Sequence, residues 1–575
     1  MTDGSDLPAA APGVASRAMA EVSTPRTFNF ADVWEYAADR VPDREALICG
    51  KRRLTYRELD DRANRFAAQL VAAGIARGDT FGIFAPNCTE WIEAMLAGWK
   101  LGALPVNINH RYGSAELAEI LTDARAVGLV FDRARGDVVA ALDPVCLRAL
   151  SLLVAIDVPG STAEPSSPLP EGTIGWDRIQ EANADAVRPV VERSGDDHYL
   201  IYTGGTTGRP KGVLWRQEDA FFACFGGGDP MRLSPVTEPA QLADHIMESP
   251  ATYLCMAPLM HAAGQWVATS WLWAGSRVVL VPGSFDPAAV WDLVDAEGVN
   301  LFTVVGDATG KPLLDTWEAN PGRWQATSVF SISNGGAPMS PALKSRFLRA
   351  FPNQIFVDGF GSSETGAQGS QRIAAVEGDG DDAARAEAGR TGVAHFSPYA
   401  ADTAVLDDRL EPVAAGSGVV GRVALKGRIP IGYLHDPERT AETFVEHDGE
   451  RWVLTGDHAT VGADGTVSLL GRGSQCINTG GEKVFVEEVE MALQAHPDIA
   501  DVVVVGVPDE RWGQAVSAVI QPRPGADIDL EAARAFLDGT LARYKHPRCV
   551  VAVDHIRRSP AGKADYRWAR SVATG

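Results

Sequence analysis

Short apolar runs alternate with helical patterns along most of this chain, and this alternation limits the folds open to it. The runs TFGIFAP (80–86) and AVGLVFD (126–132) have the length and composition of buried strands, whereas SAELAEILTDAR (114–125) has a helical pattern. A further helical segment starts with a capping box, Thr55 with Glu58. Strands that alternate with helices predict an α/β fold with largely parallel sheets.

The glycine-rich stretch GRGSQCINTGGEKV (471–484) marks a change in composition. After it come a helix pattern, two strand patterns, a second helix with an apolar stripe from Leu530 to Tyr544, and a last strand. Such a unit of about 100 residues is enough for a small α+β domain. We therefore expect a disordered tail (1–27), a large N-terminal domain (28–471), a hinge (472–474) and a small mobile C-terminal domain (475–575).

The composition excludes two classes of partner. The chain has 575 residues, with 52 basic and 75 acidic side chains and a formal net charge of −23. Such a surface repels nucleic acid and anionic lipid, so neither is expected as a main partner. Seven scattered cysteines without a Cys-x-x-Cys pair argue against a disulfide framework or a zinc site. With no secretory signal and no apolar run of the ~18 residues that suggest a membrane span, we expect a cytoplasmic protein without an integral membrane segment.

The loop YTGGTTGRPKG (202–212) has a composition that suits a polyphosphate. Its glycines expose backbone amides, its threonines supply hydroxyl donors, and Lys211 supplies a mobile positive charge. The spacing differs from the P-loop pattern Gly-x4-Gly-Lys-Ser/Thr, because the sixth residue of the stretch that begins at Gly204 is Arg209. A P-loop kinase or GTPase is therefore not expected, and a flexible surface turn is the alternative interpretation.

Five further motifs follow this loop in order: NGGAPMS (334–340), GFGSSETG (359–366), TGD (455–457), GRGSQCINTGGEKVFVEEVE (471–490) and SPAGKADYR (559–567). Together with the loop they resemble the adenylate-forming family, which contains acyl-CoA synthetases, peptide-synthetase adenylation domains and luciferases. The resemblance covers residues 28–570. It implies an N-terminal domain of stacked sheets with helices and a small C-terminal domain that swivels on a hinge.

The resemblance also implies a reaction in two halves. A carboxylate attacks the α-phosphate of Mg-ATP, which gives an acyl-adenylate and pyrophosphate. A thiol, usually that of coenzyme A, then displaces AMP to give a thioester. No carrier-protein segment follows Lys563, which disfavours a peptide-synthetase module.

The same resemblance assigns the nucleotide site. The β- and γ-phosphates would be held by Thr203, Gly204, Gly205, Thr206, Thr207, Gly208 and Lys211. Adenine and ribose would be bound by Gly336, Ala337, Pro338, Asp358, Gly359, Phe360, Asp457 and Arg472. Two positions depart from the family pattern: Gly204 replaces the usual serine, and Phe360 replaces the usual tyrosine that stacks on adenine.

The resemblance implies catalytic roles as well. Glu364 matches the magnesium ligand, since a hard cation prefers a carboxylate oxygen beside the phosphates. Ser363 would donate to the α-phosphate or to the substrate carboxylate. Lys563 would bridge the carboxylate and the α-phosphate during adenylation, where a positive charge stabilises the transition state. His261, in PLMHAAGQW, would gate the channel between the acyl pocket and coenzyme A; a core histidine is the alternative.

Two further positions concern the hinge and the thiol. Gly480 and Gly481 would border the channel for the pantetheine arm of coenzyme A. Ser474 stands where the family usually has an aspartate or lysine as the hinge of domain rotation. The hinge acts through backbone torsion, so serine is compatible with it.

The acid substrate is expected to be hydrophobic, because the motifs look like those of actinobacterial fatty-acid and steroid-side-chain CoA ligases. Candidate acyl-pocket residues are His261, Trp266, Trp271, Gly306 and Gly335, for which core packing is the alternative. A luciferase-like oxygenase and a non-catalytic binding protein are the rival functions. The binding protein would require the loss of Glu364, Asp457, Arg472 or Lys563, all of which are present. A homodimer is a further possibility for the assembly.

Overall fold

The structure is a computed structural model of the chain. It describes residues 27–160, 169–203, 211–283, 285–373, 394–399, 402–472, 475–479, 482–509, 512–538, 541–558 and 564–575. Several predicted positions lie outside the described residues: the phosphate-loop residues 204–208, the hinge residues 473–474, Gly480, Gly481, Lys563 and nearly all of the N-terminal tail.

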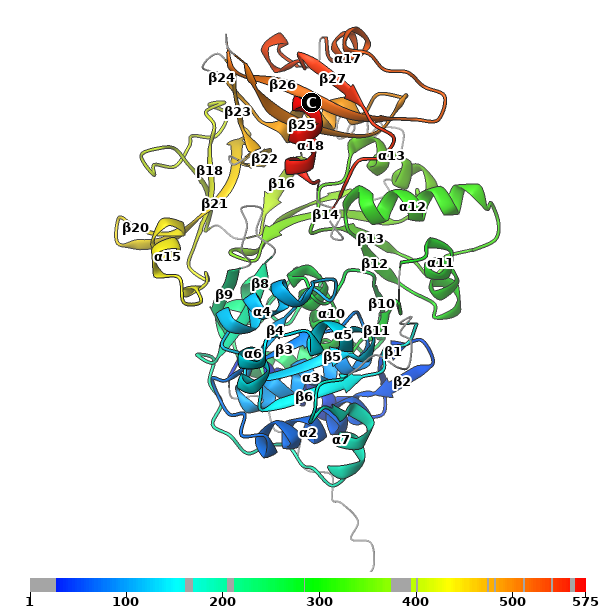
Figure 1. Cartoon of the computed structure of the whole chain (residues 1–575), viewed down its shortest axis with the longest axis vertical. Coiled ribbons are helices and arrows are strands. Elements are labelled where there is room, and N and C mark those ends of the chain that lie inside the picture. The colour runs from blue at the N-terminus through cyan, green and yellow to red at the C-terminus, as the bar shows by residue number, and fades with distance from the viewer. Residues whose placement is uncertain are drawn as a thin grey trace, which may run out of the picture.

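The largest sheet crosses the middle of the molecule (Figure 1). Its strands are β1 (Glu45–Cys49), β2 (Arg52–Thr55), β10 (Thr252–Cys255), β11 (Arg277–Leu280), β12 (Leu301–Val304), β13 (Ser331–Asn334), β14 (Ile355–Ser362), β15 (Gly366–Ile373), β16 (Ala394–Pro398), β17 (Thr403–Leu406), β18 (Gly421–Lys426), β20 (Phe444–His447), β21 (Glu450–Val461) and β22 (Val467–Arg472). The run β14-β13-β12-β10-β11-β1 is parallel, as the alternation of strands and helices predicted. From β14 onward through β15, β16, β22, β21 and β18 the described pairings are antiparallel.

A second sheet is parallel throughout its described strands. It consists of β3 (Thr80–Phe84), β4 (Leu104–Asn107), β5 (Gly128–Asp132), β6 (Leu152–Ile156) and β7 (Ile174–Gly175), in the order β4-β3-β5-β6-β7. The chain leaves β3 toward β4 on one side and returns to β5 on the other. Ligands bind at the carboxyl ends of the strands where such an order reverses.

A third, smaller sheet is antiparallel. It consists of β8 (His198–Thr203), β9 (Lys211–Arg216) and β19 (Gly432–Tyr433). The predicted phosphate loop therefore joins the end of β8 to the start of β9.

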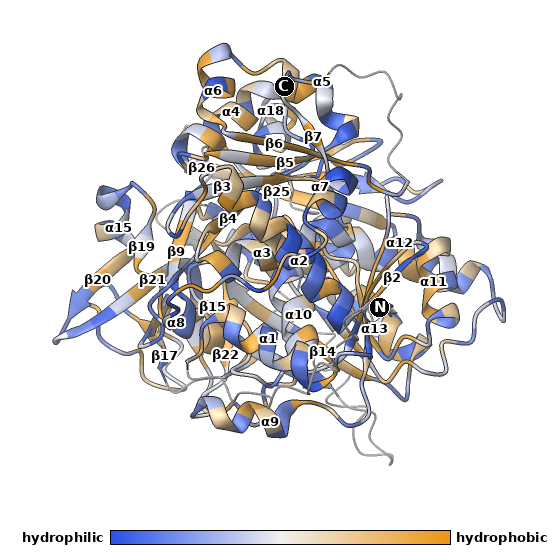
Figure 2. Cartoon of the chain, turned by 90° about the horizontal axis from the view of Figure 1, so that it is seen from below, coloured by the Kyte–Doolittle hydropathy of each residue, from blue (hydrophilic) through white to orange (hydrophobic). Residues whose placement is uncertain are grey.

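Helices cover these sheets. They are α1 (Phe30–Arg40), α2 (Tyr56–Ala72), α3 (Thr89–Leu101), α4 (Ser114–Asp123), α5 (Gly136–Ala140), α6 (Pro144–Ala149), α7 (Trp176–Ala182), α8 (Gln217–Ala223), α9 (Leu242–His245), α10 (Ala262–Trp273), α11 (Pro287–Ala296), α12 (Gly306–Ala319), α13 (Pro341–Ala350) and α15 (Pro437–Thr443). The capping box before α2 is confirmed: the Glu58 amide donates to Thr55 Oγ1, and the Thr55 amide donates to Glu58 Oε2. Figure 2 shows apolar inner strands such as β5 and β6, whereas α2 presents polar residues outward. Among the described helices, none has the length and apolar composition needed to cross a bilayer.

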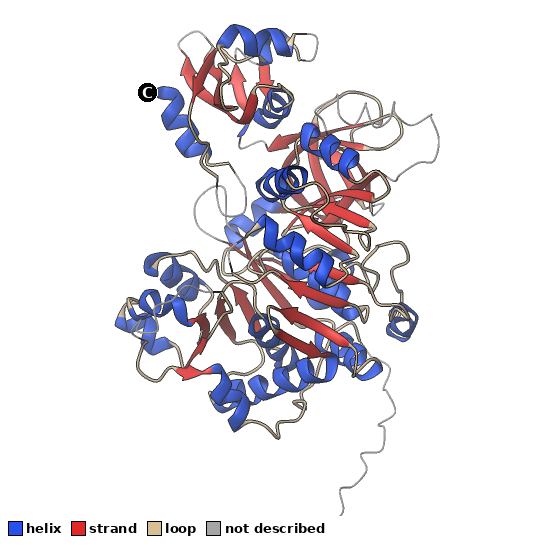
Figure 3. Cartoon of the chain, turned by 90° about the vertical axis from the view of Figure 1, so that its right-hand side faces the viewer, coloured by secondary structure: helices blue, strands red, loops and turns tan. Residues whose placement is uncertain are grey.

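A smaller α+β unit follows at the C-terminal end and lies at one end of the molecule (Figure 3). It consists of β23 (Ile477–Thr479), β24 (Glu482–Val484), α16 (Val486–Gln494), β25 (Ile499–Asp509), β26 (Gly513–Pro522), α17 (Leu530–Leu537), β27 (Cys549–Ala552) and α18 (Tyr566–Thr574). The large sheet-rich region and this smaller unit confirm the predicted fold class. One detail of the prediction is wrong: α17 ends at Leu537, so Leu541 and Tyr544 do not extend its stripe.

Candidate active site

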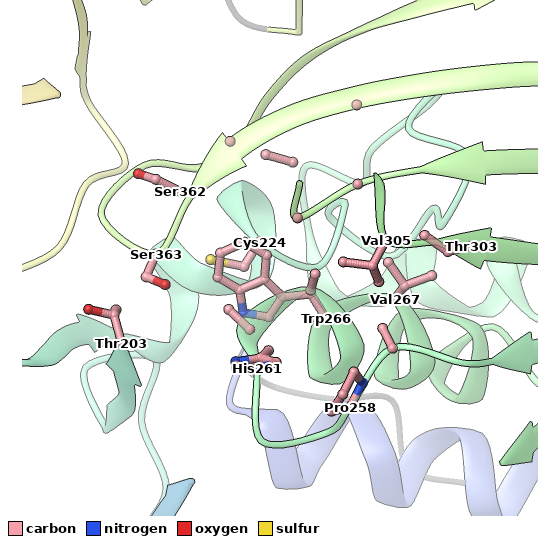
Figure 4. A pocket seen from close by; sticks show the side chains of 18 of the residues that line it. Thr203, Cys224, Pro258, His261, Trp266, Val267, Thr303, Val305, Ser362 and Ser363 are labelled. Carbon is pink, nitrogen blue, oxygen red and sulfur yellow. The ribbon is translucent and has the colours of Figure 1, made fainter. Parts of the chain in front are cut away.

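A cavity of about 1240 Å³ opens where strands of the large sheet end beside β8, β9 and α10 (Figure 4). Most of the described residues predicted for the nucleotide and the acid line it. These are Thr203, Lys211, His261, Trp266, Trp271, Gly335, Gly336, Gly359, Phe360, Ser363, Glu364 and Asp457. Motifs that are far apart in the sequence therefore meet around one space.

A second cavity of about 1060 Å³ adjoins the first and separates the large sheet from the C-terminal unit. Ala337, Pro338 and Asp358 line it, and Gly336, Gly359, Phe360 and Asp457 border both cavities. Glu487, Glu490, Arg558 and Tyr566 line the opposite side. The predicted adenine and ribose residues thus face the unit that carries Lys563.

One predicted residue, Gly306, is placed differently, and the backbone of another, Arg472, lies next to Asp457. Gly306 lines neither cavity. It has a φ of +56°, and a Cβ there would lie 2.5 Å from the Pro338 carbonyl oxygen, so the close approach of the backbone explains the glycine. Arg472 is the register partner of Asp457 across β21 and β22.

Glu364 is held at the rim of the first cavity by residues of the small sheet. Tyr433 donates its hydroxyl to Glu364 Oε1 at 3.0 Å. Lys211 Nζ lies 4.8 Å from the centroid of the Tyr433 ring. Burial, reinforced by the charge of Arg439, lowers the pKa of Lys211. Trp215 Nε1 donates to the Ser363 carbonyl at 3.0 Å, so β9 also fixes the segment before Glu364.

Asp358 does not point free into the second cavity. Its Oδ1 accepts a hydrogen bond of 2.8 Å from Asn334, and Lys344 Nζ lies 2.7 Å from its Oδ2. Asn334 also donates to the Ala337 carbonyl and accepts from the Gly306 amide. Asn334 therefore fixes the loop that carries Gly336 and Ala337. Neither Asn334 nor Lys344 is among the residues predicted from the sequence, although the asparagine before the two glycines was a signal for the former.

Asn107, at the end of β4, bridges two segments that border the first cavity. Its side-chain amide donates to the carbonyls of Tyr202 at 2.9 Å and Met260 at 2.6 Å, and its oxygen accepts from the Tyr202 amide. It thus positions the residues next to Thr203 and His261. Nothing in the local sequence around Asn107 indicated this role.

The helix α10 supplies one wall of the cavity. His261 is its N-cap residue, and Trp266, Val267 and Trp271 follow on the side that faces the cavity. Figure 4 shows Thr203 and Ser363 at one side and Thr303 at the other, with Trp266, Val267 and Val305 between them. The cavity is therefore polar at the nucleotide end and mainly apolar beyond it.

A basic lobe of the same cavity lies at the carboxyl ends of the second sheet. His110 and Arg111 follow β4, and Arg135 follows β5. Burial and the charges of Arg111 and Arg135 lower the pKa of His110 to about 4. The lobe lies where the strand order reverses, the usual place for a ligand in such a sheet. None of these three residues was predicted from the sequence.

Among the described residues, no three His, Cys, Asp or Glu side chains gather as a ready set of metal ligands. Glu364 therefore offers one carboxylate rather than a complete protein cage. Mg²⁺ is commonly bound in this way, through one or two carboxylates together with substrate phosphates and water.

Comparison with known proteins agrees with this geometry. The model of the AMP-binding enzyme family matches residues 34–433, and that of the AMP-binding enzyme C-terminal domain matches residues 488–563. A medium/long-chain-fatty-acid–CoA/3-oxocholest-4-en-26-oate–CoA ligase of Mycobacterium marinum is 40% identical over 545 residues, which cover 94% of this chain and 96% of that relative. A 3-oxocholest-4-en-26-oate–CoA ligase of Rhodococcus rhodochrous is 41% identical over 548 residues, which cover 94% of this chain and 95% of that relative.

The fold is similar to that of solved structures at lower identity. The anthranilate CoA ligase AuaEII, in complex with anthranoyl-AMP, matches with a TM-score of 0.79 at 22% identity, over 96% of this chain and 98% of that one. At that identity the likeness concerns the fold alone. The family models and the relatives, together with the ordered motifs around one cavity, show that this chain belongs to the AMP-binding enzyme family.

Proposed function

We propose that this protein is an AMP-forming carboxylic acid–CoA ligase that activates a hydrophobic acid through an acyl-adenylate. The observation that carries the proposal is the shared cavity, which joins a polar end at Thr203, Lys211, Ser363 and Glu364 to an apolar end beside α10. Such a cavity can hold a polyphosphate and an apolar acid side by side. Positioning of two reactants in this way supplies much of the catalysis of a transfer reaction.

In the first half-reaction, the acid's carboxylate would attack the α-phosphate of ATP and pyrophosphate would leave. Thr203, the loop residues 204–208 and Lys211 would hold the β- and γ-phosphates. Gly336, Ala337, Pro338 and Phe360 would contact adenine, and Asp457 and Arg472 the ribose. Because Asp358 is engaged by Asn334 and Lys344, we propose that it acts through the shape of the adenine loop.

Glu364 is the residue proposed to hold Mg²⁺. Its Oε1 accepts from Tyr433, which leaves the carboxylate oriented and still able to offer oxygen to a hard cation. When bound, the ion would neutralise charge on the phosphates that leave as pyrophosphate. Ser363 would donate a hydrogen bond to the α-phosphate or the carboxylate.

Lys563 is proposed to complete the site for adenylation. It lies in the segment between Arg558 and Ala564, both of which line the second cavity beside the predicted adenine residues. For the thiol to attack, the C-terminal domain (475–575) would rotate away on the hinge 472–474. Gly480 and Gly481 would then border the pantetheine arm, and His261 would gate its entry.

The basic lobe supports coenzyme A as the thiol substrate. The chain carries a net charge of −23, so an anionic co-substrate needs local cations. Arg111 and Arg135, whose charges both act on His110, would attract its phosphate groups. We further propose a cytoplasmic location, which agrees with seven cysteines that form no disulfide with one another. The homodimer stays a prediction.

The relatives suggest the substrate class for this chain. Their names include medium- and long-chain fatty acids and a steroid acid. The proposed acids are therefore aliphatic or ring-bearing and bind beside Trp266, Trp271 and Gly335.

The test is to supply ATP, Mg²⁺ and coenzyme A with acids of graded length and ring content. Loss of free thiol together with the formation of AMP and pyrophosphate is expected. Formation of ADP and phosphate would overturn the adenylate mechanism. Light emission that depends on oxygen would favour the luciferase-like alternative.

A further inference from the structure

The sheet face that forms the acid end of the cavity is built in rows, which follow from the parallel register. Val304 pairs with Asn334, and Asn334 pairs with Asp358. Val305, Gly335 and Gly359, one residue further along each strand, therefore form the row beside the nucleotide. All three line the cavity. The two glycines leave room for an acyl chain to pass over the sheet.

The next row inward on the same face contains two hydroxyl side chains and one valine. Thr303 pairs with Ser333, and Ser333 pairs with Val357, and all three line the cavity. Two residues along a strand span about 6.6 Å, so this row lies roughly that far beyond the glycines. Leu301 and Ser331 form a third row deeper still.

The two hydroxyls of the middle row belong to a hydrogen-bonded chain. Thr303 Oγ1 and Ser333 Oγ lie 2.7 Å apart. Tyr253 donates its hydroxyl to Thr303 Oγ1 at 3.1 Å, and Ser333 Oγ donates to the Phe302 carbonyl at 3.3 Å. With Thr303 as the donor to Ser333, each of the two hydroxyls donates one hydrogen bond and accepts one. A hydroxyl oxygen has two lone pairs, so each keeps one open acceptor position.

We propose that Thr303 and Ser333 select an acid that carries a single oxygen function, a hydroxyl or oxo group, part-way along its apolar body. This inference rests on the proposed function and names the substrate class of the same site. A hydroxyl group of the substrate would donate a hydrogen bond to the open lone pair on Thr303 or Ser333. An oxo group would accept from Ser333 if that hydroxyl turned away from its long bond to Phe302.

The residues around Thr303 and Ser333 explain why this pair would favour an oxygen-bearing acid and why an acid with a purely hydrocarbon body can still bind. Thr303 is buried, and Val305, Val267 and Trp266 lie between it and the nucleotide end (Figure 4). An oxygen function of the acid that lies beyond these residues is removed from water and needs a hydrogen-bond partner in the protein. The hydroxyls already satisfy each other when the acid is plain hydrocarbon, so covering them does not leave an orphaned donor.

The experiment compares matched acids in the full-length protein. Each plain acid is assayed for CoA-thioester formation beside analogues with one hydroxyl or oxo group at increasing distance from the carboxylate. We expect kcat/KM to be about tenfold higher for the best-placed oxygen than for the plain acid, as one buried hydrogen bond allows. Thr303→Val and Ser333→Ala should each bring this ratio close to one, whatever their effect on the absolute rate with the plain acid.

Ser331→Ala is the matched control, because it removes a cavity hydroxyl one row deeper. Its preference ratio should match that of the unmodified chain. A ratio near one at every oxygen position, or a ratio that Thr303→Val and Ser333→Ala leave intact, would overturn this inference while the ligase function stands. Absence of thioester from any acid would instead overturn the proposed function, and this inference with it.

Discussion

Two regions of this molecule enclose ionisable side chains, and the pKa values of the enclosed carboxyl groups shift in opposite directions in the two regions. In the helix layer of α1, α2 and α3, Lys100 is fully buried, 2.6 Å from Glu35 and 2.7 Å from Asp60. Arg193 lies 2.7 Å from Glu35, and Arg188 lies 2.8 Å from Asp60. Burial alone would raise the pKa of Asp60, but the charges of Lys100 and Arg188 lower it to about 2.

In the cavity between the large sheet and the C-terminal unit, the pKa values of the enclosed carboxyl groups are raised instead. Burial, reinforced by the charge of Glu487, raises the pKa of Glu490 to about 8. Glu490 accepts hydrogen bonds from the Val504 amide at 2.7 Å and the Tyr566 hydroxyl at 3.2 Å. Across the cavity, burial raises the pKa of Asp307 as well.

The directions differ because of what lies beside each carboxyl group. At Asp60 the charges of Lys100 and Arg188 outweigh burial, whereas at Glu490 burial and the charge of Glu487 outweigh the charge of Arg558. A buried carboxyl group thus favours its charged form only where the cations and hydrogen-bond donors beside it outweigh its desolvation.

The two regions are expected to lose stability at opposite ends of the pH range. The folded pKa of Asp60 is below its ordinary value of 3.8, so its stabilisation is present above that value and is lost as pH falls through about 2. The folded pKa of Glu490 is above its ordinary value of 4.5. Its contribution is fully present below pH 4.5 and is lost as pH rises through about 8.

The largest effect is expected from Lys100→Met. It would leave Glu35 and Asp60 buried without their shared cation, and breaking such a group costs roughly 3–5 kcal/mol. Denaturant unfolding measures the loss. The exposed Lys51→Met is the control and should change stability little. A loss below about 1 kcal/mol would mean that the two arginines suffice, and the comparison would fail for this layer.

Lys563→Ala should have the next largest effect, and on rate instead of stability. Loss of one preorganised charge contact in a transition state costs about 10²–10³ in rate, so adenylate formation should fall by that order. Thioester formation from a supplied acyl-adenylate should be much less affected. Pyrophosphate exchange and acyl transfer from synthetic acyl-AMP are measured in the same variant. Equal losses in the two assays would argue against domain alternation.

A smaller effect, visible only as a pH dependence, is expected from Glu490→Gln. The unmodified protein should lose stability as pH rises from 4.5 toward 8, because Glu490 must ionise while enclosed. The amide cannot ionise, so the variant should show a flatter profile. Denaturant unfolding across this pH window measures both. Glu488→Gln on the same helix is the control, since Glu488 pairs with Lys545 at 2.6 Å. Parallel profiles for Glu490→Gln and the unmodified protein would contradict the prediction.

Tyr433→Phe should give the smallest effect. Glu364 keeps its neighbour Lys211 but loses one hydrogen bond, which is worth about 1 kcal/mol. The Mg²⁺ concentration needed for half-maximal activity should rise by less than about tenfold. Titration of activity with Mg²⁺ measures this, and Glu364→Gln provides the reference for complete loss of the charge. An effect of Tyr433→Phe as large as that of Glu364→Gln would assign the tyrosine a role beyond orientation.

Local signals in the sequence predicted much of the fold. The Thr55–Glu58 capping box set the start of α2, and the apolar runs became the parallel strands β3 and β5. The stripe from Leu530 to Tyr544 misled, because helical periodicity does not report where a helix ends. Described residues of four of the six motifs line the first cavity, and those of the other two line the second, while the roles of individual residues stay predictions.

The sequence by itself determined the α/β class, the family and the kinds of side chain that line the first cavity, because each depends on spacing within a few residues. The tertiary structure decided which distant residues support them. Asn107 reaches Tyr202 across 95 residues, and Tyr433 reaches Glu364 across 69. Thr303 and Ser333 meet only because β12 and β13 pair in one register. Such contacts depend on how separate elements pack, and no local pattern of residues encodes that packing.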